Sequence, residues 1–310
     1  MAGVAAAVEE ITREGYPALR LSAGDLAATF VPQLGMIGAS LTHRGEELLG
    51  QRKGLPAYEA TGSTMGIPFL HPWANRLSGL TYDACGRTVT IDPDSPLVRL
   101  DPNGLPIHGL LNASPHWRVD VAGGELTAHL DFGAHPELLE AFPFPHDVSH
   151  RIRLDAETGL SIETTVHANA GSPVPVSFGF HPYLTLPGTP REEWQVELPV
   201  EEHLILDERG IPTGAAEPPG ETSGPLGAHT YDDGYKGIHG PFALADATRR
   251  IEVTFERGYP YVQVFAPEGQ ALICFEPMTA ATNALVAGTC EVLQPGDSLA
   301  AAFRIAPSDA

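Results

Sequence analysis

Hydrophobic and polar residues alternate at several places along the 310-residue chain. In residues 160–168, apolar or small residues occupy one parity and mostly polar residues the other, and residues 251–256 repeat this pattern. A period of two places successive side chains on opposite faces of a strand. Each segment therefore predicts a β-strand with one face against a core.

Two pairs of apolar segments flank short turn-forming sequences. Ala18 to Pro32 contains two apolar runs separated by residues 23–25, which predicts a strand, a turn and a strand. Residues 261–265 and 271–275 are separated by five residues that include proline and glycine, and they predict a hairpin. We expect its second strand to end at Glu276, which places a carboxylate at a strand end.

The remaining chain has little helical character. Residues 51–83 and 207–240 lack periodicity and predict long loops, while residues 136–141 and 279–286 each predict one or two helical turns. No long amphipathic helix alternates with the strands, which disfavours a parallel βαβ architecture. With no linker or internal repeat in view, we expect residues 1–310 to form a single all-β domain with few short helices.

Composition and charge restrict the partners. The 33 glycines and 29 prolines form about a fifth of the chain, as in proteins with many turns, and 43% of residues are hydrophobic, too many for disorder. The net charge of -21 opposes binding to nucleic acid or to an anionic membrane. No apolar run reaches the roughly 18 residues needed to span a membrane. We expect a small-molecule partner.

The cysteines and the first residues predict a cytoplasmic location. Cys85, Cys274 and Cys290 are an odd, sparse set without the spacing of a disulfide framework or a zinc site. Residues 1–8 are mildly apolar but lack the basic segment of a signal peptide. We expect reduced thiols, and the sequence does not indicate an oligomeric state.

His181 is the leading candidate for proton chemistry. It lies in the run Gly179-Phe180-His181-Pro182-Tyr183, where the glycine allows close backbone approach and the proline biases His181 toward an extended conformation. An imidazole with a pKa near 6.5 exchanges protons close to neutral pH. The alternative is a half-buried histidine at a strand end that only packs.

Other constrained segments place polar side chains in apolar surroundings. Burying an unpaired carboxylate costs several kcal/mol, so Glu276 should face a polar cleft. In Pro72-Trp73-Ala74-Asn75-Arg76, Arg76 offers a planar fork of donors and Trp73 a face on which a sugar ring could lie. Arg76 fits a role in tying down its loop equally well. His108, which precedes a glycine, is by itself typical of a surface histidine.

Taken in order along the chain, these motifs resemble those of the aldose 1-epimerases, the galactose mutarotases. The most specific parts are the runs Pro-Trp-Ala-Asn-Arg, Gly-Phe-His-Pro-Tyr and Glu-Pro-Met-Thr at residues 72–76, 179–183 and 276–279. Asp232-Asp233-Gly234-Tyr235 is a looser match. The resemblance spans nearly the whole chain and implies a large antiparallel β-supersandwich with a sugar in an open cleft, in agreement with the strand pattern.

The resemblance also implies roles for residues. Glu276 would be the general base, His181 the general acid and His108 a second histidine near the ring oxygen. The implied substrate-binding residues are Arg76, Asp232, Asn75, Trp73 and Tyr183, with Asp233 as the neighbouring candidate for Asp232. The reaction would interconvert the α and β anomers of an aldohexose such as galactose or glucose, with no metal or other cofactor. It needs His181 protonated and Glu276 ionised, a combination that the proximity of opposite charges would favour.

Two departures from the family pattern leave the substrate preference open. After His108-Gly109 the family usually continues with an aromatic residue, a small residue and arginine, whereas this chain has Leu110-Leu111-Asn112. His71 stands where an aromatic or aliphatic residue is expected, and we expect that it could add a donor to the pocket.

Three alternatives remain open. A mutarotase for hexose 6-phosphates is the nearest, but phosphate needs arginine or lysine and the motifs offer essentially Arg76. A sugar-binding protein without turnover is the second. Metal binding by His146 and His150 is the third: alternation places them on one strand face, but no third ligand is evident and a solvated face is the simpler interpretation.

Overall fold

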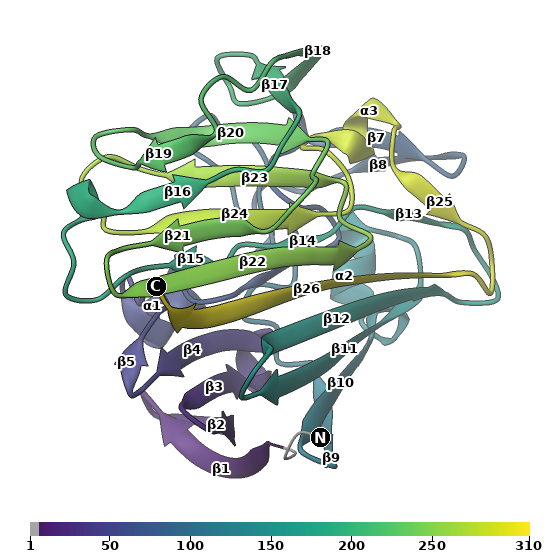
Figure 1. Cartoon of the computed structure of the whole chain (residues 1–310). Helices are drawn as coiled ribbons and strands as arrows, with labels where there is room; N and C mark the ends of the chain where they lie inside the picture. Colours follow the sequence, from purple (N-terminus) through teal and green to yellow (C-terminus); the bar gives the residue numbers. More distant parts are fainter. Residues whose placement is uncertain (1–5) are drawn as a thin grey trace.

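The computed structural model describes residues 6–310, and antiparallel strands are its main elements (Figure 1). The largest sheet has nine strands, with the C-terminal strand at its centre. In order across this sheet the strands are β19 (Ser223–Pro225), β16 (Gln195–Glu197), β21 (Phe242–Ala245), β22 (Arg249–Arg257), β26 (Ser298–Asp309), β12 (Gly159–Ala168), β11 (His146–Asp155), β10 (Glu125–Asp131) and β9 (Arg118–Ala122). The strands predicted at 160–168 and 251–256 are confirmed as β12 and β22.

The second large sheet has eight strands. Its order is β18 (Pro212–Glu217), β17 (Glu202–Leu206), β20 (Tyr231–Lys236), β23 (Tyr261–Ala266), β24 (Ile273–Met278), β14 (Gly179–Phe180) and β6 (Phe69–Leu70), with β15 (Tyr183–Leu184) also paired to β24. The predicted hairpin is confirmed as β23 and β24, but β24 continues past Glu276 to Met278. Pro277 pairs with Val262 of β23, but on the other side of β24 it lies between the positions that pair with β15 and β14, where no partner on that side needs its missing N–H.

Three smaller sheets complete the strand framework. The N-terminal sheet has the order β1 (Ala7–Arg13), β2 (Tyr16–Ala23), β3 (Leu26–Val31), β4 (Ile37–His43) and β5 (Glu46–Glu47), while β7 (Thr81–Ala84) pairs with β8 (Arg87–Thr90) and β13 (Val174–Val176) with β25 (Glu291–Leu293). Strands β2 and β3 confirm the hairpin predicted near the N-terminus. The arrangement confirms the expected large antiparallel β-supersandwich. Of residues 1–8, discussed above for the absence of a signal peptide, residues 1–5 lie outside the described part of the chain.

The α-helices are short, namely α1 (Gly54–Thr61), α2 (Pro136–Ala141) and α3 (Ala284–Ala287). Helix α2 confirms the prediction for 136–141. The helix predicted over 279–286 is shortened to α3, because Asn283 has a left-handed φ of 70° and cannot continue a right-handed helix in either direction. No helix within residues 6–310 is long and apolar enough to cross a membrane.

Two segments predicted to be long loops contain regular structure. Residues 51–83 include α1, which buries only Leu55 and Tyr58 and so has too short an apolar pattern to be recognised. Residues 207–240 include β20, because Asp232-Asp233-Gly234 has the composition of a turn but lies in a strand paired on both sides. Tertiary pairing overrides local propensity at both places.

The main hydrophobic core lies between the two large sheets. Phe242 of β21 stacks on Phe275 of β24 with ring centroids 5.3 Å apart, and Phe180 of β14 lies 5.0 Å from Phe303 of β26. Each such buried side chain contributes about 1.5–3 kcal/mol relative to leaving it in water. Because side chains alternate along a strand, the residues next to Phe180 and Phe275 project from the opposite, outer face of the eight-stranded sheet.

Three histidines are buried in the core, and their positions contradict two predictions made from the sequence. His146 and His150 share one face of β11 as predicted, but that face is buried rather than solvated. The Nδ1–H of His146 donates to the carbonyl of Phe144 at 2.6 Å, and its Nε2 lies 2.7 Å from the Nε2 of His71. His71 is therefore bound into the core, and the expectation that it adds a donor to a pocket is wrong. Burial lowers the pKa of His146 to about 4 and that of His150 to about 3, so both imidazoles are neutral.

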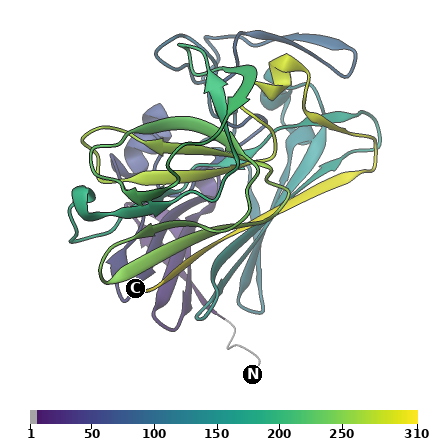
Figure 2. The same ribbon diagram turned by 45° about the horizontal axis from the view of Figure 1, so that its top comes forward.

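Segments from distant parts of the chain gather at one end of the molecule. Figure 2 brings this end forward and shows the β7–β8 hairpin, the β17–β18 hairpin and α3 near one another, as Figure 1 does at its top. The N–H of Asn283 donates to the carbonyl of Arg76, and Gly210, between β17 and β18, lies against the Arg76 guanidinium. These loops therefore hold Arg76 from two sides.

Candidate active site

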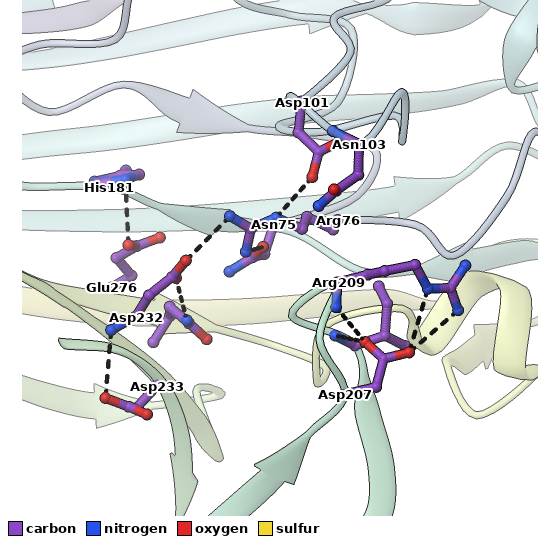
Figure 3. A network of polar contacts seen from close by, with 12 residues as sticks. Asn75, Arg76, Asp101, Asn103, His181, Asp207, Arg209, Asp232, Asp233 and Glu276 are labelled. Carbon is purple, nitrogen blue, oxygen red and sulfur yellow. Dashed lines mark hydrogen bonds and ion pairs between the residues drawn. The ribbon is translucent and has the colours of Figure 1, made fainter. Parts of the chain in front are cut away.

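Two short strands on the same side of β24 bring His181 and Glu276 together. His181 lies in the gap between β14 and β15, and Glu276 lies in the facing part of β24. The strand pairs that flank them are Gly179 with Met278 and Tyr183 with Cys274. In this register His181 is directly opposite Glu276, and the His181 Nε2 is 3.2 Å from the Glu276 Oε1 (Figure 3).

A cavity of ≈ 180 Å³ opens beside this pair. Ligand pockets for drug-sized molecules usually exceed about 300 Å³, so the cavity suits one small molecule. Most of its lining side chains can donate or accept hydrogen bonds, which fits a polyhydroxylated ligand. The lining residues are Arg52, Thr64, Asn75, Arg76, Ile107, His108, His181, Tyr183, Asp232, Phe265 and Glu276.

Strand alternation places Asp232, and not Asp233, in the cavity lining. The Gln263 amide of β23, which faces Glu276 across the β23–β24 pair, donates to the Asp232 Oδ1 at 2.8 Å. Asp233 projects from the opposite face of β20, and its Oδ1 lies 3.2 Å from the Nε2 of His203. The parity of β20 therefore favours Asp232 over Asp233 as the candidate ligand-binding residue.

Arg76 is oriented by two carboxylates. Its Nε donates to the Asp101 Oδ2 and its Nη2 to the Asp232 Oδ2, each at 3.1 Å, and its Nη1 donates to the Asn75 Oδ1 at 3.3 Å (Figure 3). A planar guanidinium held by several partners keeps a fixed direction. Arg76 thus ties its loop together and lines the cavity, so both interpretations of its sequence position apply.

Burial determines the charge of the central pair. Glu276 is 1% exposed and His181 is 4% exposed. Desolvation raises the pKa of Glu276 well above its ordinary value and lowers the pKa of His181 well below its own, so both neutral forms are favoured. This corrects the expectation that proximity of opposite charges would hold His181 protonated and Glu276 ionised. In the free protein the proton that the two side chains share resides mainly on Glu276.

His108 is held beside His181 by a strained backbone. The His108 and His181 ring centroids are 5.4 Å apart, and the N–H of His108 donates to the carbonyl of Asn75. Its φ of 66° is in the left-handed region, which costs a residue other than glycine of order 1–3 kcal/mol and is often found at functional sites. Burial and nearby arginines lower the pKa of His108 to about 3. His108 is therefore a neutral hydrogen-bonding group.

Trp73 does not line the cavity, although the sequence predicts that it offers a ring face to a sugar. Its indole is fully buried in the main core, so no ring face is open to a sugar. Burial of this large apolar ring is strongly favourable, and the loop turns it inward while Asn75 and Arg76 line the cavity. Tyr183, which the resemblance implies as a substrate-binding residue, lines the cavity. Its ring stacks on His181 with centroids 4.3 Å apart, and its hydroxyl lies 3.2 Å from the His181 Nε2.

Four lining residues were not predicted, namely Arg52, Thr64, Ile107 and Phe265. Arg52 and Thr64 lie in the irregular region 51–83, where no periodicity indicates which way a side chain points. The Thr64 hydroxyl lies 2.6 Å from the Tyr183 hydroxyl. Phe265 could have been found, because in the predicted hairpin it shares a strand face with the position opposite Glu276.

Within residues 6–310 one group of three potential metal ligands was found, formed by His116, His135 and Glu137. None of the three lines the cavity. The two imidazoles are stacked with centroids 3.7 Å apart and an interplanar angle of 22°. The lone pairs of the two stacked rings thus lie in separate, nearly parallel planes and do not converge on one ion, as a zinc site would require.

Known proteins resemble this chain in sequence and in fold. The chain is 30% identical over 195 residues to the Uncharacterized protein YihR of Escherichia coli K12, a match that covers 62% of this chain and 58% of that protein's length. A galactose mutarotase-like protein from Clostridium acetobutylicum superposes with a TM-score of 0.86 at 18% identity, over 99% of both chains. The galactose 1-epimerase from Lactobacillus acidophilus NCFM gives a TM-score of 0.75 at 14% identity, over 99% of both chains. These structures show a shared fold.

The model of the Aldose 1-epimerase family matches residues 17–306. That match runs from the second strand of the N-terminal sheet into β26 and includes every residue that lines the cavity. It confirms the resemblance seen in the motifs. The chain therefore belongs to the aldose 1-epimerase family.

Proposed function

We propose that this protein is a mutarotase that interconverts the α and β anomers of an aldohexose. The observation that carries the proposal is the pairing of His181 with Glu276 at 3.2 Å in a cavity lined by hydrogen-bonding side chains. An acid and a base that can exchange one proton are the groups that this reaction needs. Asn75, Arg76 and Asp232 supply donors and acceptors for the sugar hydroxyls.

The reaction proceeds by ring opening and reclosure. Glu276 as the carboxylate removes the proton from the hydroxyl on C1, while His181 as the imidazolium gives a proton to the ring oxygen. The bond between C1 and the ring oxygen breaks and a C1 aldehyde forms. Rotation about C1–C2 presents the other face of the aldehyde, and the same groups act in reverse during reclosure.

The closeness of the two side chains suits this chemistry. The anomeric hydroxyl oxygen and the ring oxygen are both bonded to C1, so the groups that handle their protons must lie side by side. His181 and Glu276 meet this requirement because the β14–β24 register places them opposite one another. Each positioned proton transfer typically contributes about 10²–10⁴-fold to the rate.

The pair must hold one proton for turnover. Moving that proton from Glu276 to His181 generates the reactive form, and the nearby Arg76 guanidinium favours the carboxylate. Sugar hydroxyls bonded to the carboxylate would favour it further. His108, neutral at the same pH, would orient the sugar near its ring oxygen.

Polarimetry tests the proposal directly. Freshly dissolved α-D-glucose or α-D-galactose should approach its equilibrium rotation faster in the presence of catalytic amounts of the protein. A sugar-binding protein without turnover would leave the rate constant at its uncatalysed value, because trace protein cannot bind a significant fraction of the sugar. An unchanged rate constant for every aldohexose tried would exclude mutarotation.

Activity should follow a bell-shaped pH profile with a plateau through neutral pH. At low pH the His181–Glu276 pair binds a second proton, and Glu276 can no longer act as the base. Because burial lowers the pKa of His181, this acidic limb of the profile lies at lower pH than for an ordinary histidine. At high pH the pair loses its one proton, and no acid remains. Because burial raises the pKa of Glu276, this alkaline limb lies at higher pH than for an ordinary glutamate. The two apparent pKa values of this profile belong to the coupled pair and not to either residue alone. Initial rates from about pH 4 to about pH 10 test this, and a monotonic profile would contradict a shared proton.

A further inference from the structure

We propose that Arg52 selects substrates in which the aldohexose carries an oxyanion on carbon 6, either a carboxylate or a phosphate. This inference rests on the proposed function and narrows its substrate class. Arg52 and Arg76 are the two arginines that line the cavity. The sequence motifs indicated Arg76 alone, so Arg52 changes the balance of charge at the site.

The two arginines differ in their partners. Arg76 is neutralised by Asp101 and Asp232, each 3.1 Å from a guanidinium nitrogen. Arg52 forms no ion pair with any of the described residues from Ala6 onward, although the chain has 39 acidic residues and only 18 lysines and arginines. A guanidinium without a carboxylate partner at a ligand cavity is available to an anion.

Arg52 is aimed at the cavity by two neutral acceptors. Its Nη1 donates to the Tyr183 hydroxyl at 3.2 Å and to the Thr64 carbonyl at 3.3 Å, and its guanidinium carbon lies 5.2 Å from the centre of the Tyr183 ring. These contacts use one of its three nitrogens. Guanidinium donors in a planar fork match the geometry of carboxylate and phosphate oxygens, so the other two nitrogens can bind an oxyanion.

The backbone at Arg52 gives a second, independent argument. Arg52 has a φ of 44° in a turn that closes with a hydrogen bond from the Gly54 N–H to the Gln51 carbonyl. Glycine, asparagine or aspartate is favoured at such a position, and another residue there costs of order 1–3 kcal/mol. A strained arginine on a cavity wall is consistent with selection for its side chain.

The position of Arg52 predicts which sugar carbon carries the anion. The Tyr183 hydroxyl contacts both Arg52 and the His181 Nε2, so one hydroxyl group separates the guanidinium from the imidazole. His181 is the group that gives a proton to the ring oxygen. The ring oxygen of an aldohexopyranose is bonded to C1, whose hydroxyl faces Glu276 in the proposed reaction, and to C5, which carries carbon 6. The substituent that we infer reaches Arg52 is therefore the one on carbon 6.

The local charge around the cavity supports anion binding despite the acidic chain. Arg52, Arg76 and Arg99 are all close enough to His108 to disfavour its protonated form. Arg99, like Arg52, has no carboxylate partner within residues 6–310. Because Arg76 is neutralised by its two carboxylates, Arg52 and Arg99 are the positive charges near the cavity that favour an anionic ligand.

The test compares D-glucuronate and D-glucose 6-phosphate with D-glucose, each corrected for uncatalysed mutarotation. Wild-type kcat/KM should be at least tenfold higher for one anionic sugar than for D-glucose, and that sugar identifies carboxylate or phosphate as the preferred group. In Arg52→Gln the ratio of anionic to neutral kcat/KM should fall about 10–100-fold, mainly through KM, because the contact exists before and during reaction. Arg52→Lys should recover part of the ratio.

The matched control is Lys53→Gln, which removes one positive charge from the next residue, an exposed side chain outside the cavity lining. It should leave the ratio unchanged. Equal losses for all three sugars in Arg52→Gln would mean that Arg52 only supports Tyr183 and Thr64, and would overturn the inference. A wild type that prefers D-glucose would overturn it too while leaving mutarotation intact, whereas no acceleration with any sugar would refute the proposed function itself.

Discussion

Replacing Glu276 by glutamine should lower kcat about 10²–10⁴-fold, the range for loss of one positioned proton-transfer group. Glutamine has nearly the same shape, so it preserves packing in β24, but its amide neither accepts nor releases the proton that passes to His181. Sugar binding relies on other side chains, so KM should change much less. The measurement is the catalysed rate of mutarotation as a function of sugar concentration.

Thermal unfolding separates this loss from misfolding. Because burial disfavours an ionised carboxylate at Glu276, the neutral amide should leave the Tm unchanged or raise it. Glu268→Gln is the matched control, since Glu268 is an exposed carboxylate in the loop of the same hairpin and does not line the cavity. Retention of kcat to within a factor of about three in Glu276→Gln would remove Glu276 from the mechanism.

Gly179→Ala should disrupt the site through the backbone. A Cβ at Gly179 would lie 2.5 Å from the carbonyl oxygen of Pro277 and 3.1 Å from the Cβ of Ala74, so β14 and β24 would have to separate. Overpacking of this kind typically costs about 1–3 kcal/mol of stability. Because the same pairing sets the contact between His181 and Glu276, kcat should fall as well.

Chemical denaturation and polarimetry of the same preparation measure both effects of Gly179→Ala. Gly171→Ala is the control, because nothing lies within 4 Å of its added Cβ and its φ is not in the left-handed region. We expect Gly171→Ala to retain stability and rate. If Gly179→Ala behaved in the same way, the β14–β24 spacing would not be what positions the pair.

The sequence predicted well those parts in which local pattern and tertiary structure agree. Strands β12 and β22 have a period of two, and β23 and β24 flank a turn with proline and glycine. The sequence alone therefore predicted these strands and the face of the sheet on which their side chains lie. The family motifs indicated His181 and Glu276, and the structure brings these two into contact. Their neutral state was not predictable, because the loops that bury them have no pattern.

Other features depend on packing that a single sequence does not reveal. Trp73 carries the same aromatic face whether it lines a cavity or fills a core, and only the path of its loop decides between them. Arg52 belongs to no recognisable motif. Its place at the cavity depends on its contacts with Tyr183, which is far from it in the sequence, and with Thr64, which lies in a segment without periodicity. Strand β20 has the composition of a turn and is held by its two neighbours.

The central place of β26 in the nine-stranded sheet has a consequence for how the chain folds. Strand β26 pairs with β12 on one side and with β22 on the other, so it joins two groups of four strands that otherwise do not pair with each other. On a ribosome, this sheet cannot close until residues 298–309 have emerged. Until then each group has an unpaired edge where β26 will bind, and such an edge is open to pairing with other chains.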